Sequence, residues 1–132
     1  MTLPPLLAVS LGNSRVQLGR FADGRLEDQQ AVASDDDAGF AQSLSALWAD
    51  AAPNPDDQPA VLLASVNPAR EAAIEQALAK HTGRPVARIE RDLPVPVGRQ
   101  LDPEALPGED RLLNAAAAYD ALKVACAVVD LG

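Results

Sequence analysis

The sequence has 132 residues, of which 48% are hydrophobic and 3% aromatic, and its formal net charge is −8. This length fits one ordinary domain, and the acidic balance leaves no basic surface for nucleic acid or an anionic membrane. The single cysteine, Cys126, excludes an internal disulfide, and no apolar run approaches the roughly 20 residues of a membrane span. We therefore expect a cytoplasmic protein that binds neither nucleic acid nor membrane.

Three strands are predicted at the start of the chain, over residues 6–11, 15–21 and 26–32. The first is a nearly continuous apolar run, the second alternates apolar and polar residues, and the third follows the hairpin turn Asp23-Gly24. We expect these strands to form one antiparallel unit.

The next predicted element is a helix that follows the acidic stretch SDDD, in which Ser34 or an aspartate provides the cap. Its apolar residues recur at helical spacing, namely Phe40, Leu44, Leu47 and Trp48. One amphipathic helix is therefore expected before the proline-rich stretch APNPDDQP.

The stretch AVLLAS, at residues 60–65, is apolar throughout, as a strand covered on both faces would be. Asn67 and Pro68 follow it as a helix cap and first helical residue, and Gly83 is a natural stop for that helix. We expect the strand to add beside residues 6–11.

The last part of the chain is predicted to contain a strand at 85–90, a loop with four prolines at 92–107, a helix at 108–123 and a strand at 125–132. An antiparallel unit followed by alternating helices and strands predicts an α/β fold with a mixed sheet, parallel additions and helices covering the sheet. This order suits a ribonuclease-H-like half-domain of the kind found in sugar kinases and actin-type ATPases.

Four short motifs occur along the chain, and one of them, VVDLG, repeats the pattern of AVSLG near the start. The motifs are LGNSR at 11–15, ASVNP at 64–68, LPGEDRLLNA at 106–115 and VVDLG at 128–132. In their order and spacing they resemble the type III pantothenate kinases, the first enzymes of coenzyme A synthesis. The resemblance implies ATP with Mg²⁺, a monovalent cation (K⁺ or NH₄⁺), pantothenate as substrate and a homodimer for the full-length family.

The turn at Gly12 is the first candidate site. Glycine lets the backbone approach a phosphate closely, and the amides that follow it can donate hydrogen bonds. Taken alone, this loop is better interpreted as a plain hairpin turn. The resemblance implies that ATP and its phosphates are bound by Ser10, Leu11, Gly12, Asn13, Ser14, Arg15, Val16 and Gln17.

Asp110 is the candidate general base. It lies at the start of a predicted helix, where the macrodipole favours a carboxylate, and Arg111 beside it is suited to pair with the carboxylate of a substrate. An acidic first helical turn without a catalytic role is the alternative. The resemblance makes Asp110 the proton acceptor and implies that pantothenate is bound by Leu101, Gly108, Glu109, Asp110 and Arg111.

Asp130 is the candidate metal ligand. It ends a predicted apolar strand, and Gly132 lies two residues after it, a pattern found where α/β sheets hold metals and phosphates at their edges. The resemblance implies that this aspartate helps to bind the monovalent cation, and a solvated carboxylate at the strand end is the alternative.

Two residues depart from the family pattern, because Ser10 stands where the family has an aspartate and Leu101 where many members have a tyrosine. The resemblance divides the chain into an N-terminal ribonuclease-H-like half-domain at 1–107 and, at 108–132, a connecting helix and the first strand of a second half-domain. Three functions remain open: the N-terminal half of a pantothenate kinase, a non-catalytic binding or regulatory protein, and an inactive truncated product.

Overall fold

A computed structural model describes residues 3–54, 56–95, 109–123, 127 and 129, without the side chains of Glu109 and Asp110. The elements in chain order are β1 (Leu6–Leu11), β2 (Arg15–Ala22), β3 (Arg25–Ala33), α1 (Asp37–Ala51), β4 (Ala60–Ser65), α2 (Pro68–Thr82), β5 (Val86–Arg88) and α3 (Glu109–Leu122). The predicted α/β class is confirmed, and the five strands and three helices predicted within the described residues are all present.

The five strands form one mixed sheet in the order β3-β2-β1-β4-β5. β1 pairs with β2, and β2 with β3, in antiparallel fashion, whereas β4 lies parallel to β1 and β5 parallel to β4. Asp23 and Gly24 both have positive φ, as the two-residue hairpin between β2 and β3 requires. The predicted antiparallel unit and the parallel addition of residues 60–65 are therefore confirmed.

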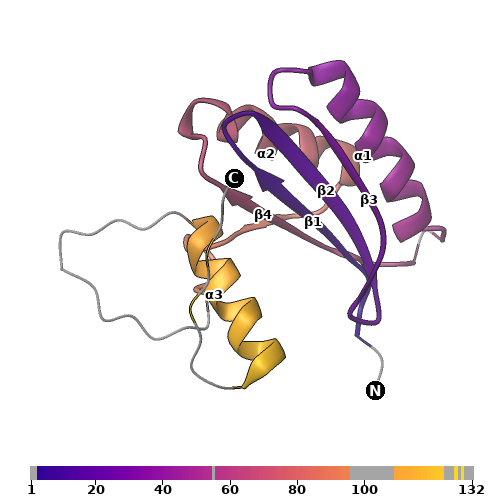
Figure 1. Cartoon of the computed structure of the whole chain (residues 1–132). Helices are drawn as coiled ribbons and strands as arrows, with labels where there is room; N and C mark the ends of the chain where they lie inside the picture. Colours follow the sequence, from indigo (N-terminus) through magenta and orange to yellow (C-terminus); the bar gives the residue numbers. More distant parts are fainter. Residues whose placement is uncertain (1–2, 55, 96–108, 124–126, 128, 130–132) are drawn as a thin grey trace.

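One face of the sheet forms the hydrophobic core. Alternation along β1 points Leu7, Val9 and Leu11 to this face, where they are at most 2% exposed. Helices α1 and α2 cover it (Figure 1), and they add a shared set of buried apolar side chains: Phe40, Leu44, Leu47, Ile74 and Leu78. The odd-numbered residues of β1 are therefore structural.

The opposite face of the sheet carries smaller residues, among them Ala8, Ser10 and Ala64. Helix α3 packs against β4 (Figure 1), and Leu113 lines a hollow with these three residues. The two helical layers thus lie on opposite faces of β4, which explains why the β4 sequence is apolar throughout.

The helix ends confirm one expectation about capping and correct another. Of the two predicted alternatives, Ser34 or an aspartate, an aspartate caps α1: Asp36 Oδ1 accepts a hydrogen bond of 2.9 Å from the Gly39 N–H. Asn67 occupies the N-cap position of α2, but its side chain makes no capping hydrogen bond. Gly83 ends α2 in the left-handed conformation, with φ 65°, as predicted.

The strand predicted at 85–90 is shorter in the structure, where β5 ends at Arg88. The chain turns at Glu90, which has φ 67°, and the N–H groups of Asp92 and Leu93 both donate to the Arg88 carbonyl. The strand predicted at 125–132 lies outside the described residues except for 127 and 129. No described helix has the length and apolar character needed to cross a bilayer.

Candidate functional site

The turn between β1 and β2 lies at the edge of the sheet where the parallel strands β1 and β4 both end. The Gly12 N–H closes it by donating to the Arg15 carbonyl at 2.8 Å. A Cβ atom at position 12 would lie 3.1 Å from that same oxygen, so a side chain there would press on the turn. Glycine therefore favours the close approach across the turn, and a side chain there would force the Arg15 carbonyl to shift.

All three carbonyl groups of residues 12–14 are bound by neighbouring segments. Asn67 Nδ2 donates to the Gly12 carbonyl at 3.2 Å, and Ser34 Oγ donates to that of Asn13 at 2.9 Å. The Ser34 N–H donates to the Ser14 carbonyl at 2.9 Å. The negative ends of these peptide groups are thus held by the protein itself.

The N–H groups of Asn13 and Ser14 make no hydrogen bond within the described part of the chain, and both residues are exposed. Two neighbouring N–H groups without an internal acceptor form a concentration of positive partial charge that suits an anion. In α/β sheets, ligands bind at the carboxyl ends of the strands, where this turn lies.

Ser10 lies on the sheet face opposite the core, directly across from Gln17 on β2 and Ala64 on β4. It is exposed and lines two hollows. One, of about 80 Å³, also includes Gly12 and Ser65, and the other, of about 290 Å³, also includes Gln17 and Leu113. Ser10 therefore connects the turn to the surface beneath α3.

Of the remaining residues predicted to bind phosphate, two have side chains in the core and two have exposed side chains. The Leu11 and Val16 side chains are each 1% exposed in the core, so these residues offer an anion only backbone groups. Arg15 and Gln17 are exposed beside the turn.

The predicted pantothenate and metal sites are only partly within the described residues. Glu109 and Asp110 begin α3 and Arg111 is exposed on it, whereas Leu101, Gly108 and Asp130 lie outside the described residues. Among the described residues, there is no group of three or more His, Cys, Asp or Glu side chains that could hold a metal ion. The roles of Asp110 and Asp130 therefore stay predictions.

Sequence reasoning missed two residues of the site, Ser34 and Asn67. The sequence pattern predicts Asn67 as the cap of α2 and Ser34 as one of two alternative caps of α1, because serine and asparagine at such positions usually cap. Only the pairing of β1 with β4, and of β2 with β3, brings their side chains to the turn. ASVNP is a recognisable motif, but nothing in it indicates a partner 55 positions away.

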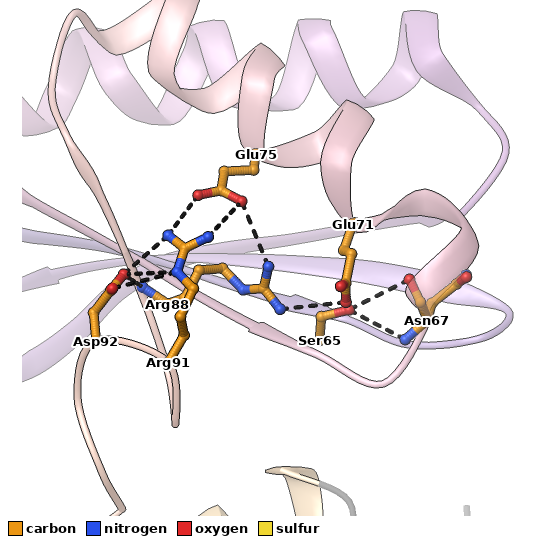
Figure 2. Close-up of polar contacts among 7 residues, drawn as sticks. All are labelled: Ser65, Asn67, Glu71, Glu75, Arg88, Arg91 and Asp92. Atoms are coloured by element: carbon orange, nitrogen blue, oxygen red, sulfur yellow. Dashed lines mark hydrogen bonds and ion pairs between the residues drawn. The ribbon is translucent and has the colours of Figure 1, made fainter.

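A second polar cluster, of ion pairs, lies farther along α2 (Figure 2). Arg88 is 9% exposed and reaches Glu71 at 3.2 Å and Glu75 at 3.5 Å, while Arg91 makes a two-pronged contact with Glu75. Hydrogen bonds from Arg91 hold the pKa of Glu75 below its usual 4.5 despite partial burial. Bonds from the Arg91 side chain and the Arg88 N–H likewise lower the pKa of Asp92. Each carboxylate of this cluster thus has a cationic partner.

Comparison with known proteins identifies the family. A family model described as type III pantothenate kinase matches residues 6–132. A type III pantothenate kinase of Desulfovibrio desulfuricans is 28% identical over 120 residues, which are 87% of this chain and 45% of that protein. The chain belongs to the type III pantothenate kinase family and spans less than half the length of this curated relative.

One solved structure, from a structural study of the Aquifex aeolicus PPX-GPPA enzyme, has a slight likeness to the chain. It matches with a TM-score of 0.40 and 11% identity, over 64% of this chain and 35% of that one. A likeness of this size supports no assignment, so the family rests on the sequence match.

Proposed function

We propose that this chain provides the phosphate-binding and pantothenate-facing half of an ATP-dependent pantothenate kinase, which forms 4'-phosphopantothenate. Phosphoryl transfer needs alignment of the two substrates, compensation of the phosphate charge and a base for the attacking hydroxyl. The turn at residues 12–15 serves the first two needs, and Asp110 serves the third.

The observation that carries the proposal is the orientation of the peptide groups in this turn. Its three carbonyls are held by Asn67 and Ser34, and the N–H groups of Asn13 and Ser14 lack a partner among the described residues. A turn with its carbonyls bound by the protein and neighbouring N–H groups open offers an anion donors without nearby repelling oxygens, which is the arrangement that phosphate binding requires.

The start of α3 supplies the substrate side of the proposal. Asp110 lies three residues before Leu113, which lines the 290 Å³ hollow shared with Ser10 and Gln17. That volume is near the lower limit for small-molecule sites, and the lining is mainly apolar with a few polar groups. We propose that Asp110 accepts the proton of the pantothenate hydroxyl and that Arg111 pairs with the pantothenate carboxylate.

For the metal ions, the proposal names only which ions the kinase would use and which residue would help to hold one. A kinase of this family would use ATP with Mg²⁺, and Asp130 would help to hold K⁺ or NH₄⁺. The described residues at the turn offer hydroxyl groups and peptide N–H groups, but they do not make a metal site. We therefore propose no step through a metal. A cytoplasmic homodimer is proposed on the same family grounds.

Ser10 favours a second candidate, a family member that binds its ligands without catalysing transfer. Serine at this position supplies a hydroxyl but no charge, and the family has an aspartate there. Ser10 is exposed, and its neighbour across the sheet is the small residue Ala64, so a carboxylate fits at this position.

The experiment compares four proteins: the chain, its Ser10→Asp variant, a fusion to the C-terminal half of the Desulfovibrio desulfuricans relative, and that fusion with Ser10→Asp. ATP-dependent formation of phosphopantothenate is measured with potassium present. The isolated chain should be inactive with either residue, because half a cleft neither orients both substrates nor excludes water. In the fusion, Ser10→Asp should raise turnover roughly 100-fold.

The matched control is Ser45→Asp in the fusion, which adds the same charge on the exposed surface of α1 and should leave turnover unchanged. Full activity of the isolated chain would contradict the division into two halves. A fusion that binds ATP and pantothenate but stays inactive with Ser10→Asp would favour the non-catalytic candidate.

A further inference from the structure

We propose that Ser34 and Asn67 are positioning residues, which hold the carbonyls of residues 12–14 inward so that the Asn13 and Ser14 N–H groups face a phosphate. This inference rests on the proposed function and extends it to two residues outside the turn. Neither residue needs to touch the ligand in this role.

The first argument is the match between donors and acceptors. The turn has three consecutive carbonyls, and three donors from two other segments bind them: Asn67 Nδ2, Ser34 Oγ and the Ser34 N–H, at 2.9–3.2 Å. An unbound carbonyl at this place would turn toward the ligand and repel a phosphate. Rotating a peptide group inward places its N–H outward, so binding the carbonyls also sets the direction of the donors.

The second argument concerns the missing half of a strand pair. In an antiparallel ladder, a hydrogen-bonded pair exchanges two bonds. Ser34 donates its N–H to the Ser14 carbonyl, but its own carbonyl accepts Arg70 Nε at 3.1 Å instead of the Ser14 N–H. Arg70 is held in place by an ion pair with Asp37 at the start of α1. The Ser34 carbonyl thus binds Arg70, and the Ser14 N–H, which makes no hydrogen bond among the described residues, is available to a ligand.

The third argument is the hydrogen-bond partner of the Asn67 side chain. Asparagine is among the best N-cap residues, and Asn67 precedes α2, yet its amide group donates to Gly12 and does not cap the helix. The backbone N–H of Asn67 donates to Ser65 Oγ at 3.1 Å (Figure 2). This bond orients Asn67 toward the end of β1. The Asn67 side chain therefore binds the turn and does not cap α2.

The test uses the ¹⁵N-labelled 132-residue chain and inorganic tripolyphosphate as the probe. The amide shifts of Asn13 and Ser14 are followed by NMR during titration, for wild type, Ser34→Ala, Ser34→Thr and Asn67→Ala. Loss of one neutral hydrogen bond should weaken binding at the turn roughly fivefold in each alanine variant. Ser34→Thr keeps the hydroxyl group and should bind like wild type.

Two matched controls, Ser45→Ala on α1 and Asn54→Ala in the loop after it, remove the same groups far from the turn and should not change binding. A ligand-free measurement separates positioning from folding. The three-bond HN–Hα couplings of Asn13 and Ser14 report their backbone angles and should change in both alanine variants, but not in the controls. All variants are compared at a temperature where circular dichroism shows them folded.

The outcomes distinguish the two proposals. If the wild-type amides of residues 13 and 14 do not respond to tripolyphosphate, the phosphate-binding role of the turn is wrong, and the positioning role with it. If wild type binds and Ser34→Ala and Asn67→Ala bind equally well with unchanged couplings, only the positioning role is wrong. Weakened binding in the alanine variants, with recovery in Ser34→Thr, supports both.

Discussion

The two polar clusters along α2 use hydrogen bonds in opposite ways. At the start of the helix, Asn67 and Arg70 bind backbone carbonyls around the β1–β2 turn. One and two turns further on, Glu71 and Glu75 bind the guanidinium groups of Arg88 and Arg91 (Figure 2). The first cluster is largely neutral and leaves two N–H groups without a partner among the described residues, whereas the second pairs its charges with one another.

This difference indicates which cluster serves a ligand. Paired opposite charges have little left to offer a substrate, so the Arg88 cluster is interpreted as structural: it ties α2 to β5 and the turn that follows. The turn cluster binds acceptors and exposes donors, which is the arrangement that an anion requires. The following predictions test that distinction, from the largest expected effect to the smallest.

Arg88→Met should destabilise the protein most, because it breaks a nearly buried ion-pair cluster while Glu71 and Glu75 remain. Complete removal of one partner from a buried pair typically costs 3–5 kcal/mol, and partial exposure of the two glutamates reduces this to about 1–3 kcal/mol. Urea denaturation measures the free energy of unfolding, with the exposed Arg25→Met as the matched control.

Equal or greater stability of Arg88→Met would contradict a structural role for the cluster. The buried Nε of Arg88 has no hydrogen-bond partner among the described residues. Such a result would mean that the desolvation of this guanidinium outweighs its ion pairs.

Asn67→Ala should have a smaller effect on stability than Asp36→Ala, although both residues occupy N-cap positions. Asp36 caps α1 with its side chain, and losing such a cap typically costs about 1 kcal/mol, with a range of roughly 0.5–2. Asn67 makes one hydrogen bond to the Gly12 carbonyl instead, and losing it should cost about 0.5–1 kcal/mol. Urea denaturation of the two variants side by side measures this, and a larger loss in Asn67→Ala would show that its side chain does cap α2.

The smallest expected effect is the response of the Arg88 cluster to acid. The pKa values of Glu75 and Asp92 lie below their usual 4.5 and 3.8, so the folded state binds protons less readily than the unfolded state. Their contribution to stability is complete above those usual values and is lost as the pH falls through the lowered ones. The urea midpoint of wild type should therefore fall more steeply below about pH 4.5 than that of Arg91→Gln. Parallel pH profiles for the two proteins would contradict the prediction, and Arg25→Gln is the charge-matched control.

Much of the fold was predictable from sequence because its elements carry local patterns. The continuous apolar run of AVLLAS, the positive-φ pair Asp23-Gly24 and the stop at Gly83 each reflect a requirement of the backbone or of a buried face. Strand length was less predictable: β5 ends at Arg88 because the Arg88 carbonyl accepts hydrogen bonds from the turn that follows, although Ile89 continues the apolar pattern.

The site divides in the same way. The sequence by itself determined the turn at Gly12, since a side chain would press on the Arg15 carbonyl there, and the motif order determined the family. Only the tertiary structure decided what Ser34 and Asn67 do. A polar side chain before a helix has two possible partners, its own helix or a distant carbonyl, and local sequence describes only the first. The parallel pairing of β1 with β4 places Asn67 within 3.2 Å of the Gly12 carbonyl, so the distant partner is within reach, and its side chain binds there instead of capping α2.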